Sequence, residues 1–442
     1  MHQLATVPSD TELPKSADVV VIGGGIVGAC TGLFLAEAGF KVVICEKGEF
    51  GAEQSSRNWG WVRKMGRDPR ELPLAIQAFE EWKGLNALTG EETGFRQQGI
   101  TYFAETEEMM AKYLHWLDYA REYQLDTREI SSDELKELVP GMSREFAGGL
   151  HTPSDGMAEP ALVTAAVVTG ARKFGALAFS RCAVRGVETE AGKLSGVVTE
   201  KGAIKCPFAV LAGGTWSTLF ARNLGIRIPQ LKFLANVMRT EPIAGGPEGC
   251  GSGPGFGFRK RMDGGYNVSM RSAHPVDIVP DSFRFYRDFQ QALSHEKKAM
   301  RLRVSRRSFH ELMVPNSWKL DAVSPFEKER ILNPEPAHKI LDEAKVNIGK
   351  LFPALKDIRI ADRIGGQVDA TPDALPIISG VDDIPGLHVA TGFSGHGLGV
   401  APGAGRMIAQ MIQGKTPLVD PEPYRLSRFT DGTKIEHWPI GF

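Results

Sequence analysis

Residues 18–46 read DVVVIGGGIVGACTGLFLAEAGFKVVICE, and the order of residue types in this stretch decides the fold. The β-branched apolar run at 19–22 predicts a strand that is buried on both faces. Gly23, Gly25 and Gly28 follow at the G-x-G-x-x-G spacing, before a helical pattern and a second apolar run. Strand, glycine turn, helix and strand in this register predict a βαβ unit whose glycine turn binds the pyrophosphate of a dinucleotide.

Each position of this unit has its own physical role. Gly23 permits the tight turn, Gly25 lets the backbone approach the phosphates, and Gly28 lets the helix pack closely on the strand. The unpaired N–H groups and the positive dipole end of the helix then face the phosphates. Glu46 ends the second strand, where a carboxylate accepts hydrogen bonds from ribose hydroxyls. The uncharged run 19–36 also has the length of a membrane span, but its glycines and the charged residues that follow it argue against one.

The composition is that of a globular protein with a large core. Of the 442 residues, 42% are hydrophobic and 24% are charged, and the formal net charge is −1. The length fits two or three domains, and the charge balance argues against a general nucleic-acid or membrane-surface binder. The five cysteines form no C-x-x-C pair and have no metal-ligand spacing, which favours a reducing, cytoplasmic setting. Residues 1–15 lack the pattern of a signal peptide and are predicted to form a loose leader.

Patterns typical of α/β structure recur in three separate parts of the chain. We predict that residues 16–95, 145–230 and 353–425 together form one discontinuous, Rossmann-like nucleotide-binding domain. Residues 96–144 and 231–352 are predicted to form an inserted substrate domain. The second of these segments alternates short strand-like runs with Gly- and Pro-rich turns, which indicates a mainly antiparallel β-sheet. Residues 426–442 are predicted to be a C-terminal tail.

Apolar periodicity and turn residues predict the individual elements. Residues 263–265 (DGG) predict a hairpin turn, and residues 282–302 predict one charged helix. The basic residues in and after this helix are interspersed with Glu296, Met300 and Leu302, which favours a solvated helix face over a nucleic-acid or lipid site. These basic residues are Lys297, Lys298, Arg301, Arg303, Arg306 and Arg307. Further helices are predicted at 73–88, 107–123 and 161–174, and strands at 99–104, 181–188, 196–199, 208–212 and 387–391.

Six motifs, in the expected order, make the chain resemble the D-amino-acid-oxidase-like family of FAD-dependent oxidoreductases. The family includes glycine oxidase, sarcosine oxidase, D-amino acid dehydrogenase and γ-glutamylputrescine oxidase. The resemblance covers nearly the whole chain, and it implies the glutathione-reductase-2-like FAD/NAD(P)-binding fold. The motifs are VVVIGGGIVGACTGLFLAEAGFKVVICEK, SSRNWG, GGLHTPSDGMAEP, AVLAGGTWS, ATPDALPIISG and LHVATGFSGHGLGVAPGAG.

The resemblance implies a set of FAD-binding residues. The helix after the turn at 395–398 is expected to point its N-terminus at N1 and the C2 carbonyl of the flavin, where negative charge gathers on reduction. Sarcosine-oxidase-like members tether the flavin through a cysteine in this region, but no cysteine follows Cys250, so non-covalent FAD is expected. The implied residues are Gly23, Gly25, Ile26, Val27, Gly28, Glu46, Lys47, Ser55, Ser56, Arg57, Asn58, Trp59, Gly60, Val184, Ala212, Gly213, Trp216, Gly366, Gly395, His396, Gly397 and Leu398.

The candidate catalytic and substrate residues lie near these motifs. Arg63 and His396 are the predicted catalytic residues, with a surface arginine and a solvent-facing histidine as the alternatives. Many family members use an arginine for the substrate carboxylate at the place where Val368 occurs here, so the anchor must come from elsewhere. The predicted substrate contacts are Arg259, Arg261 and Arg271 around the hairpin, for a carboxylate, and Tyr266 and Trp61 as aromatic walls. The alternatives for these residues are a solvated edge hairpin and core packing.

The family chemistry is oxidation of a C–N bond. A hydride passes to flavin N5, and the resulting imine is hydrolysed to a keto acid or aldehyde plus an amine. The resemblance therefore implies an amino acid or amine oxidase or dehydrogenase. A flavoenzyme that oxidises a CH–OH substrate, and a non-catalytic flavin-binding subunit, are the alternatives. The expected electron acceptor is either oxygen or a carrier such as a quinone. If it is a carrier, the protein is expected to associate with a membrane. No transmembrane segment is expected, and a homo-oligomer is compatible with the sequence.

Overall fold

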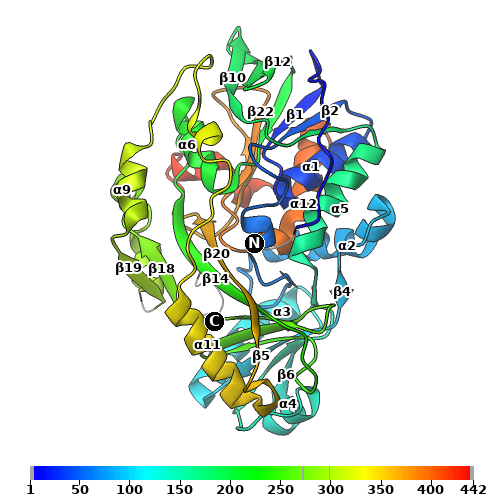
Figure 1. The fold of residues 1–442 in the computed structure, drawn as a ribbon, viewed down its shortest axis with the longest axis vertical. Helices are drawn as coiled ribbons and strands as arrows, with labels where there is room; N and C mark the ends of the chain where they lie inside the picture. Colours follow the sequence, from blue (N-terminus) through cyan, green and yellow to red (C-terminus); the bar gives the residue numbers. More distant parts are fainter. Residues whose placement is uncertain (1–3, 271–272, 298, 439–442) are drawn as a thin grey trace.

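The computed structural model describes residues 4–270, 273–297 and 299–438, and two large sheets dominate it (Figure 1). The first sheet lies in the upper half of Figure 1 and has the strand order β21-β22-β13-β1-β2-β9. Five of its strands are parallel, and β21 pairs antiparallel with β22 at the edge. The strands are β1 (Val19–Ile22), β2 (Val42–Cys45), β9 (Leu177–Phe179), β13 (Phe208–Leu211), β21 (Ile377–Gly380) and β22 (Leu387–Thr391).

β1 lies inside this sheet and is buried on both faces, as its sequence predicts. Val19 and Val21 belong to a core formed with helices, whereas Val20 and Ile22 belong to the core on the opposite face. The helices of the first core are α1 (Ile26–Glu37), α2 (Leu72–Thr89), α5 (Pro160–Lys173) and α12 (Gly397–Ile412). The second core includes the antiparallel strands β10 (Val184–Glu190), β11 (Lys193–Thr199) and β12 (Gly202–Lys205).

The second sheet lies in the lower half of Figure 1 and has the order β20-β14-β17-β16-β15-β5-β7-β6. Its strands pair antiparallel except for β15 with β5. β7 and β20 fall inside the ranges predicted for the nucleotide-binding domain, yet their hydrogen bonds place them in this sheet. The strands are β5 (Ile100–Ala104), β6 (Arg128–Ser131), β7 (Gly148–Thr152), β14 (Leu231–Thr240), β15 (Cys250–Gly253), β16 (Phe256–Lys260), β17 (Tyr266–Ser269) and β20 (Ile360–Ala370).

The predicted charged helix at 282–302 is wrong. The segment forms two short helices, α7 (Pro280–Arg284) and α8 (Gln290–Glu296), followed by strand β19 (Met300–Arg303), which pairs parallel with β18 (His274–Asp277). Phe285, Phe289 and Ala292 form a small core of their own. The apolar spacing in the sequence therefore corresponds to packing in only this part of the segment. Helix α9 (Arg306–Met313) follows, and β18, β19 and α9 form the left edge of the molecule in Figure 1.

The other predicted helices agree with the structure to within one or two residues, and the hairpin at 263–265 joins β16 to β17. The strand predicted at 181–188 begins only at Val184, because Arg181 adopts a positive φ in the turn after β9. The remaining elements are β3 (Trp61–Val62), β4 (Arg96–Gln97), β8 (Gly156–Met157), α3 (Glu107–Glu122), α4 (Ser132–Leu138), α6 (Ser217–Asn223), α10 (Pro325–Lys328), α11 (His338–Leu351), and short 3-10 helices at Gln54–Ser56, Gly214–Trp216, Pro353–Leu355, Glu422–Tyr424 and Leu426–Phe429.

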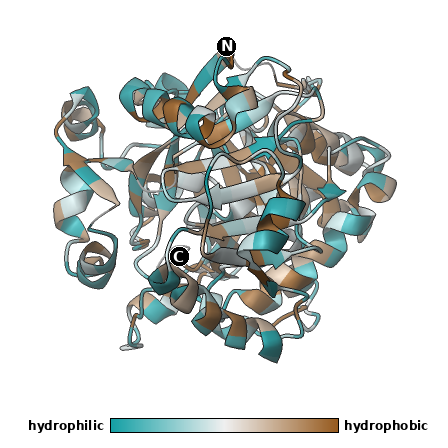
Figure 2. Ribbon diagram, turned by 90° about the horizontal axis from the view of Figure 1, so that it is seen from below, coloured by the Kyte–Doolittle hydropathy of each residue, from teal (hydrophilic) through white to brown (hydrophobic). Residues whose placement is uncertain are grey.

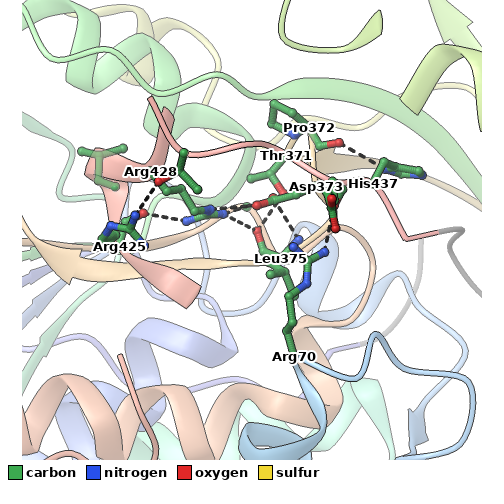
Figure 3. A network of polar contacts seen from close by, with 12 residues as sticks. Arg70, Thr371, Pro372, Asp373, Leu375, Arg425, Arg428 and His437 are labelled. Atoms are coloured by element: carbon green, nitrogen blue, oxygen red, sulfur yellow. Dashed lines mark hydrogen bonds and ion pairs between the residues drawn. The ribbon is translucent and has the colours of Figure 1, made fainter. Parts of the chain in front are cut away.

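The segment predicted as a tail is attached to the loop after β20 (Figure 3). Arg428 is 3% exposed and binds both carboxylate oxygens of Asp373, with Nε–Oδ2 and Nη2–Oδ1 distances of 2.8 and 3.2 Å. Arg428 also donates to the carbonyl oxygen of Leu375, and a ring nitrogen of His437 lies 3.1 Å from the carbonyl oxygen of Pro372. Residues up to 438 therefore form part of the fold. In the part of the chain that the structure describes, no helix combines the length and the apolar character needed to cross a membrane.

Candidate active site

A cavity of about 340 Å³ lies where the two sheets meet. Ile22, Cys45 and Leu211 line it, and these residues are the carboxyl ends of β1, β2 and β13. In open parallel sheets, ligands bind in the crevice outside these strand ends. The opposite wall comes from β14, β17 and β20 of the second sheet. The cavity therefore joins the predicted nucleotide site to the sheet that was predicted to hold the substrate.

The N-terminus of α1 forms one end of the cavity. A β carbon on Gly23 would lie 2.4 Å from the carbonyl oxygen of Ala212, so only glycine fits this turn. Helix α1 has no side-chain N-cap and no acidic residue in its first turn, although Ser55 Oγ accepts a hydrogen bond from the N–H of Ile26 at 2.9 Å. Such a helix end attracts an anion. Glu46 accepts hydrogen bonds from the N–H groups of Gly24 and Gly48, both at 2.7 Å, and burial raises the pKa of its carboxyl group.

The loop after β2 is held by its own polar side chains. Asn58 donates to the carbonyl oxygens of Gln54 and Ser55 and accepts from the N–H of Gly60. A second network links this loop to residues 329–332, where Lys47 Nζ donates to the carbonyl oxygens of Glu329 and Arg330 and the N–H of Leu332 donates to Glu53. Glu53 accepts hydrogen bonds from Lys47 Nζ at 2.6 Å and from Trp216 Nε1 at 3.0 Å, and Lys47 Nζ lies 4.4 Å from the Trp216 ring centroid. The predicted cofactor residues Lys47 and Trp216 thus form one wall of the cavity.

The turn before α12 carries a buried histidine. His396 Nδ1 lies 3.1 Å from Glu71 Oε2, and Arg67 Nη1 lies 3.5 Å from the same oxygen. Because a carboxylate only accepts, Nδ1 carries the hydrogen, and Nε2 has no hydrogen-bond partner among the described residues. Burial, with the positive charge of Arg67, lowers the pKa of His396 to about 4. Burial alone would raise the pKa of Glu71, but the charges of Arg67 and His396 bring it to about 2. The ring is therefore neutral near pH 7.

Acidification is expected to destabilise the protein through His396. Its pKa is about 4 in the folded chain against 6.5 for an ordinary histidine, so the unfolded chain binds the proton more readily. The free energy of unfolding should fall as the pH drops from about 6.5 to about 4, by up to about 3 kcal/mol from this group. Denaturant unfolding at several pH values measures this fall. In His396→Gln, the free energy of unfolding should decrease less with falling pH than in the parent, because the contribution of His396 is absent. His115→Gln, at an exposed site on α3, is the control, and parallel pH profiles for His396→Gln and the parent would contradict the account.

Part of the cavity lining is aromatic. Trp59 and Trp61 meet edge to face with ring centroids 4.9 Å apart, and Trp61 lies 6.2 Å from the Tyr102 ring. The guanidinium of Arg63 lies 5.8 Å from the Tyr102 centroid and donates to the carbonyl oxygen of Met65. Within the described residues, the Arg63 guanidinium makes no other hydrogen bond or ion pair. Phe233 from β14 belongs to the same wall and contacts His274, with centroids 5.1 Å apart.

Most of the predicted site residues line this one cavity. Both predicted catalytic residues, Arg63 and His396, lie on it, as does Trp61 among the predicted substrate contacts. Gly28, Ser56 and Gly60 are not lining residues. The predicted cofactor residues on the lining are Gly23, Gly25, Ile26, Val27, Glu46, Lys47, Ser55, Arg57, Asn58, Trp59, Val184, Ala212, Gly213, Trp216, Gly366, Gly395, His396, Gly397 and Leu398.

The structure corrects the prediction for the hairpin residues. Arg259 is 1% exposed and holds both carboxylate oxygens of Glu159, at 2.8 and 3.0 Å. Arg261 is bound to Asp263 and to backbone carbonyl oxygens, and the hydroxyl of Tyr266 donates to the carbonyl oxygen of Pro247. The side chains of Arg259, Arg261 and Tyr266 do not line the cavity. Their contacts stabilise the fold instead. Arg271 lies outside the described residues.

Two residues of β14 and β17 belong to the site although the sequence did not single them out. Asn236 and Ser269 line the cavity, and Nδ2 of Asn236 has no hydrogen-bond partner in the described part of the chain. β14 pairs with β20, so Phe233 lies opposite Val368 and Asn236 opposite Gly365. Val368, the place where many family members have an arginine, thus lines the cavity as an apolar residue.

Comparison with known proteins assigns the family. The DAO family of FAD dependent oxidoreductases matches residues 18–411. The chain belongs to this family. The chain superposes on L-amino acid deaminase from Proteus myxofaciens in complex with anthranilate with a TM-score of 0.94, at 35% identity and covering 97% of each chain. For L-amino acid deaminase from Proteus vulgaris the TM-score is 0.92 and the identity 32%, covering 96% of this chain and 100% of that one.

Sequence relatives include 4-methylaminobutanoate oxidase (formaldehyde-forming) from Paenarthrobacter nicotinovorans, 25% identical over 427 residues. These residues are 96% of this chain and 47% of the relative, so the chain spans about half the length of that protein. Glycine oxidase from Pseudomonas aeruginosa is 23% identical, with 92% of this chain and 98% of the relative covered.

The residues of the cavity fit FAD. α1 and α12 both begin at the cavity without a side-chain cap and without an acidic residue in the first turn. The carboxylate of Glu46 lies at the end of β2, where a ribose is bound in dinucleotide sites. Trp61 Nε1, Asn236 Nδ2 and His396 Nε2 are buried and have no hydrogen-bond partner among the described residues. A bound cofactor and substrate would supply partners for such groups.

Proposed function

We propose that this oxidoreductase uses FAD to oxidise the C–N bond of an amino acid or a related amine, acting on a CH–NH₂ or CH–NH donor. The observation that carries the proposal is a single cavity lined by two chemically different groups of residues. One group has Glu46 and the N-terminus of α1, which carries no acidic residue, and the other has Trp59, Trp61 and the guanidinium of Arg63. The deaminase and oxidase relatives support the same class of reaction.

In this proposal the protein binds and orients, and FAD supplies the hydride acceptor when it is bound. Arg63 binds the substrate carboxylate, and the aromatic residues exclude water and hold the side chain. His396 stays neutral, with its ring fixed by the hydrogen bond to Glu71. Its Nε2 is then an acceptor on the cavity wall. The N-terminus of α12 favours negative charge in the cavity as electrons arrive.

The reaction class is tested with the FAD-loaded protein and an artificial dye as acceptor. The panel contains primary amino acids, N-methylated amino acids and 2-hydroxy acids. We expect dye reduction with one or more amines, together with keto acid or aldehyde and released amine in equal amounts. Turnover only with hydroxy acids would favour the CH–OH alternative. Bound FAD with no turnover on any substrate would favour the non-catalytic subunit. Admission of air in place of the dye shows whether oxygen also serves as the electron acceptor.

Replacing Arg63 with methionine is expected to raise KM for an amino acid by roughly tenfold to a hundredfold. A charge-assisted hydrogen bond to a carboxylate contributes about 1.5–3 kcal/mol. KM for the corresponding amine without a carboxylate should not rise. Arg359→Met, at a residue whose side chain is 82% exposed, is the control. Arg271→Met is measured in parallel. A carboxylate-specific loss in Arg271→Met but not in Arg63→Met would contradict the role of Arg63.

We further propose that the FAD is held non-covalently. Cys45 is the only cysteine among the described lining residues, and it lies in β2 next to Glu46, at the ribose end of the cavity. Acid precipitation should therefore release the yellow cofactor into the supernatant. Colour that stays with the precipitate would contradict this proposal.

A further inference from the structure

Seven acidic side chains are buried in the part of the chain that the structure describes, and six of them form an ion pair. The seventh, Asp369, is 2% exposed and pairs with no arginine, lysine or histidine among the described residues. The middle of the molecule consists mainly of pale and brown strands, with much of the teal on the helices around them (Figure 2). An unpaired carboxylate is costly in such surroundings. The six pairs are Asp68–Arg70, Glu71–Arg67, Asp155–Lys64, Glu159–Arg259, Asp277–Arg303 and Asp373–Arg428.

The carboxylate of Asp369 is held by uncharged donors. Its Oδ2 accepts hydrogen bonds from the N–H of Gly392, at 2.9 Å, and from Nε2 of Gln230. The same Nε2 lies 3.2 Å from the carbonyl oxygen of Gly214, which only accepts, so this atom is the amide nitrogen. Burial raises the pKa of Asp369, and the hydrogen bond from the Gly392 N–H opposes this rise by favouring the ionised form. An asparagine oxygen could accept both bonds, so holding these groups does not require a negative charge.

Asp369 lies in the part of the cavity that is farthest from the ribose end. It belongs to the lining and precedes the last residue of β20. Gly214 follows β13 and Gly392 follows β22, so the carboxylate lies at the carboxyl ends of these two strands. In the order β22-β13-β1-β2, the predicted pyrophosphate turn follows β1, and Glu46 follows β2. FAD that binds ribose and pyrophosphate there extends its flavin half towards β13, β22 and the N-terminus of α12.

We propose that the negative charge of Asp369 lowers the reduction potential of bound FAD. Reduction places negative charge on the flavin, and a buried carboxylate nearby repels it because the local dielectric constant is low. The N-terminus of α12 acts in the opposite direction, since it favours negative charge in the same cavity. Asp369 thus keeps the reduced cofactor from becoming too stable to pass its electrons to the acceptor. The proposal rests on FAD binding and is independent of the amine chemistry proposed above.

The test is the midpoint potential of the FAD-loaded chain, measured without oxygen by slow reduction in the presence of a reference dye. Asp369→Asn is expected to favour the reduced cofactor by about tenfold or more, which is a rise of about 30 mV for a two-electron couple. Asp369→Thr removes the same charge with a β-branched residue that suits a strand, and its potential should also rise. No amine is present, so a failure here leaves the proposed amine oxidation intact.

Asp382→Asn is the matched control, because it removes an exposed charge from the turn between β21 and β22. Its potential should equal that of the parent. Thermal unfolding and titration with FAD show whether each variant folds and binds the cofactor. Equal potentials in the parent and both Asp369 variants, or a lower potential in these variants, would overturn the proposal. Failure of both variants to fold or to retain FAD would also overturn it, because the carboxylate would then serve stability or binding instead.

Discussion

Arg428→Met is expected to lower the free energy of unfolding by about 3–5 kcal/mol, the usual cost of removing one partner of a buried ion pair. The side chains of Arg428 and Asp373 are 3% and 2% exposed, and two hydrogen bonds join them (Figure 3). The change leaves the carboxylate of Asp373 buried without its counter-charge. It also removes the donor to the carbonyl oxygen of Leu375. Denaturant unfolding with a two-state fit measures the difference.

A surface pair in the same C-terminal segment supplies the control. Lys434 lies 2.6 Å from Glu436, but its side chain is 84% exposed. Lys434→Met is therefore expected to leave the stability nearly unchanged. If Arg428→Met and Lys434→Met cost the same, the Asp373 contact is not what attaches residues 426–438 to the fold.

Gly25→Val is expected to weaken FAD binding by at least about a hundredfold, or about 3 kcal/mol, while the chain still folds. Gly25 has φ −71° and ψ 175°, an extended conformation that any residue adopts. A β carbon there would lie 3.2 Å from Ser55 Oγ, a tight contact that a small shift of the Ser55 side chain relieves. The valine would instead occupy the space where a pyrophosphate must approach the backbone. Quenching of FAD fluorescence on titration of the apoprotein measures the affinity.

Gly84→Ala is the matched control for this variant. Gly84 lies in α2, and among the described residues no atom outside its own stretch of helix lies within 4 Å of a β carbon placed on it. The Gly84→Ala variant should bind FAD like the parent and gain about 0.5–1 kcal/mol of stability. Unchanged FAD affinity in Gly25→Val would show that the cofactor does not approach this turn.

The parts of the site that could be predicted are those whose geometry is local in sequence. Gly23, Gly25 and Glu46 lie within one βαβ unit, and their spacing carries the chemistry of dinucleotide binding. The turn at 395–398 is equally local, because it is a glycine-rich turn between a strand and a helix. The structure brings these segments to one cavity because β2, β1, β13 and β22 are parallel neighbours in one sheet.

The parts that could not be predicted depend on contacts between distant residues. Arg259 was expected to meet a substrate, but Glu159, a hundred positions earlier, neutralises it. Asn236 faces the cavity through the register of β14 on β20, which no local pattern encodes. The buried partner of His396 is Glu71, and nothing near either residue in the sequence indicates the pair. The break of the predicted 282–302 helix likewise follows from the pairing of β19 with β18.

The most direct test of the account is the visible spectrum of the FAD-loaded protein, recorded without oxygen while amino acids are added. The account predicts that at least one amino acid or N-substituted amine bleaches the oxidised flavin band, and that the corresponding 2-hydroxy acid does not. A protein that is shown to be folded but fails to bind FAD, or whose flavin is bleached only by hydroxy acids, would contradict it.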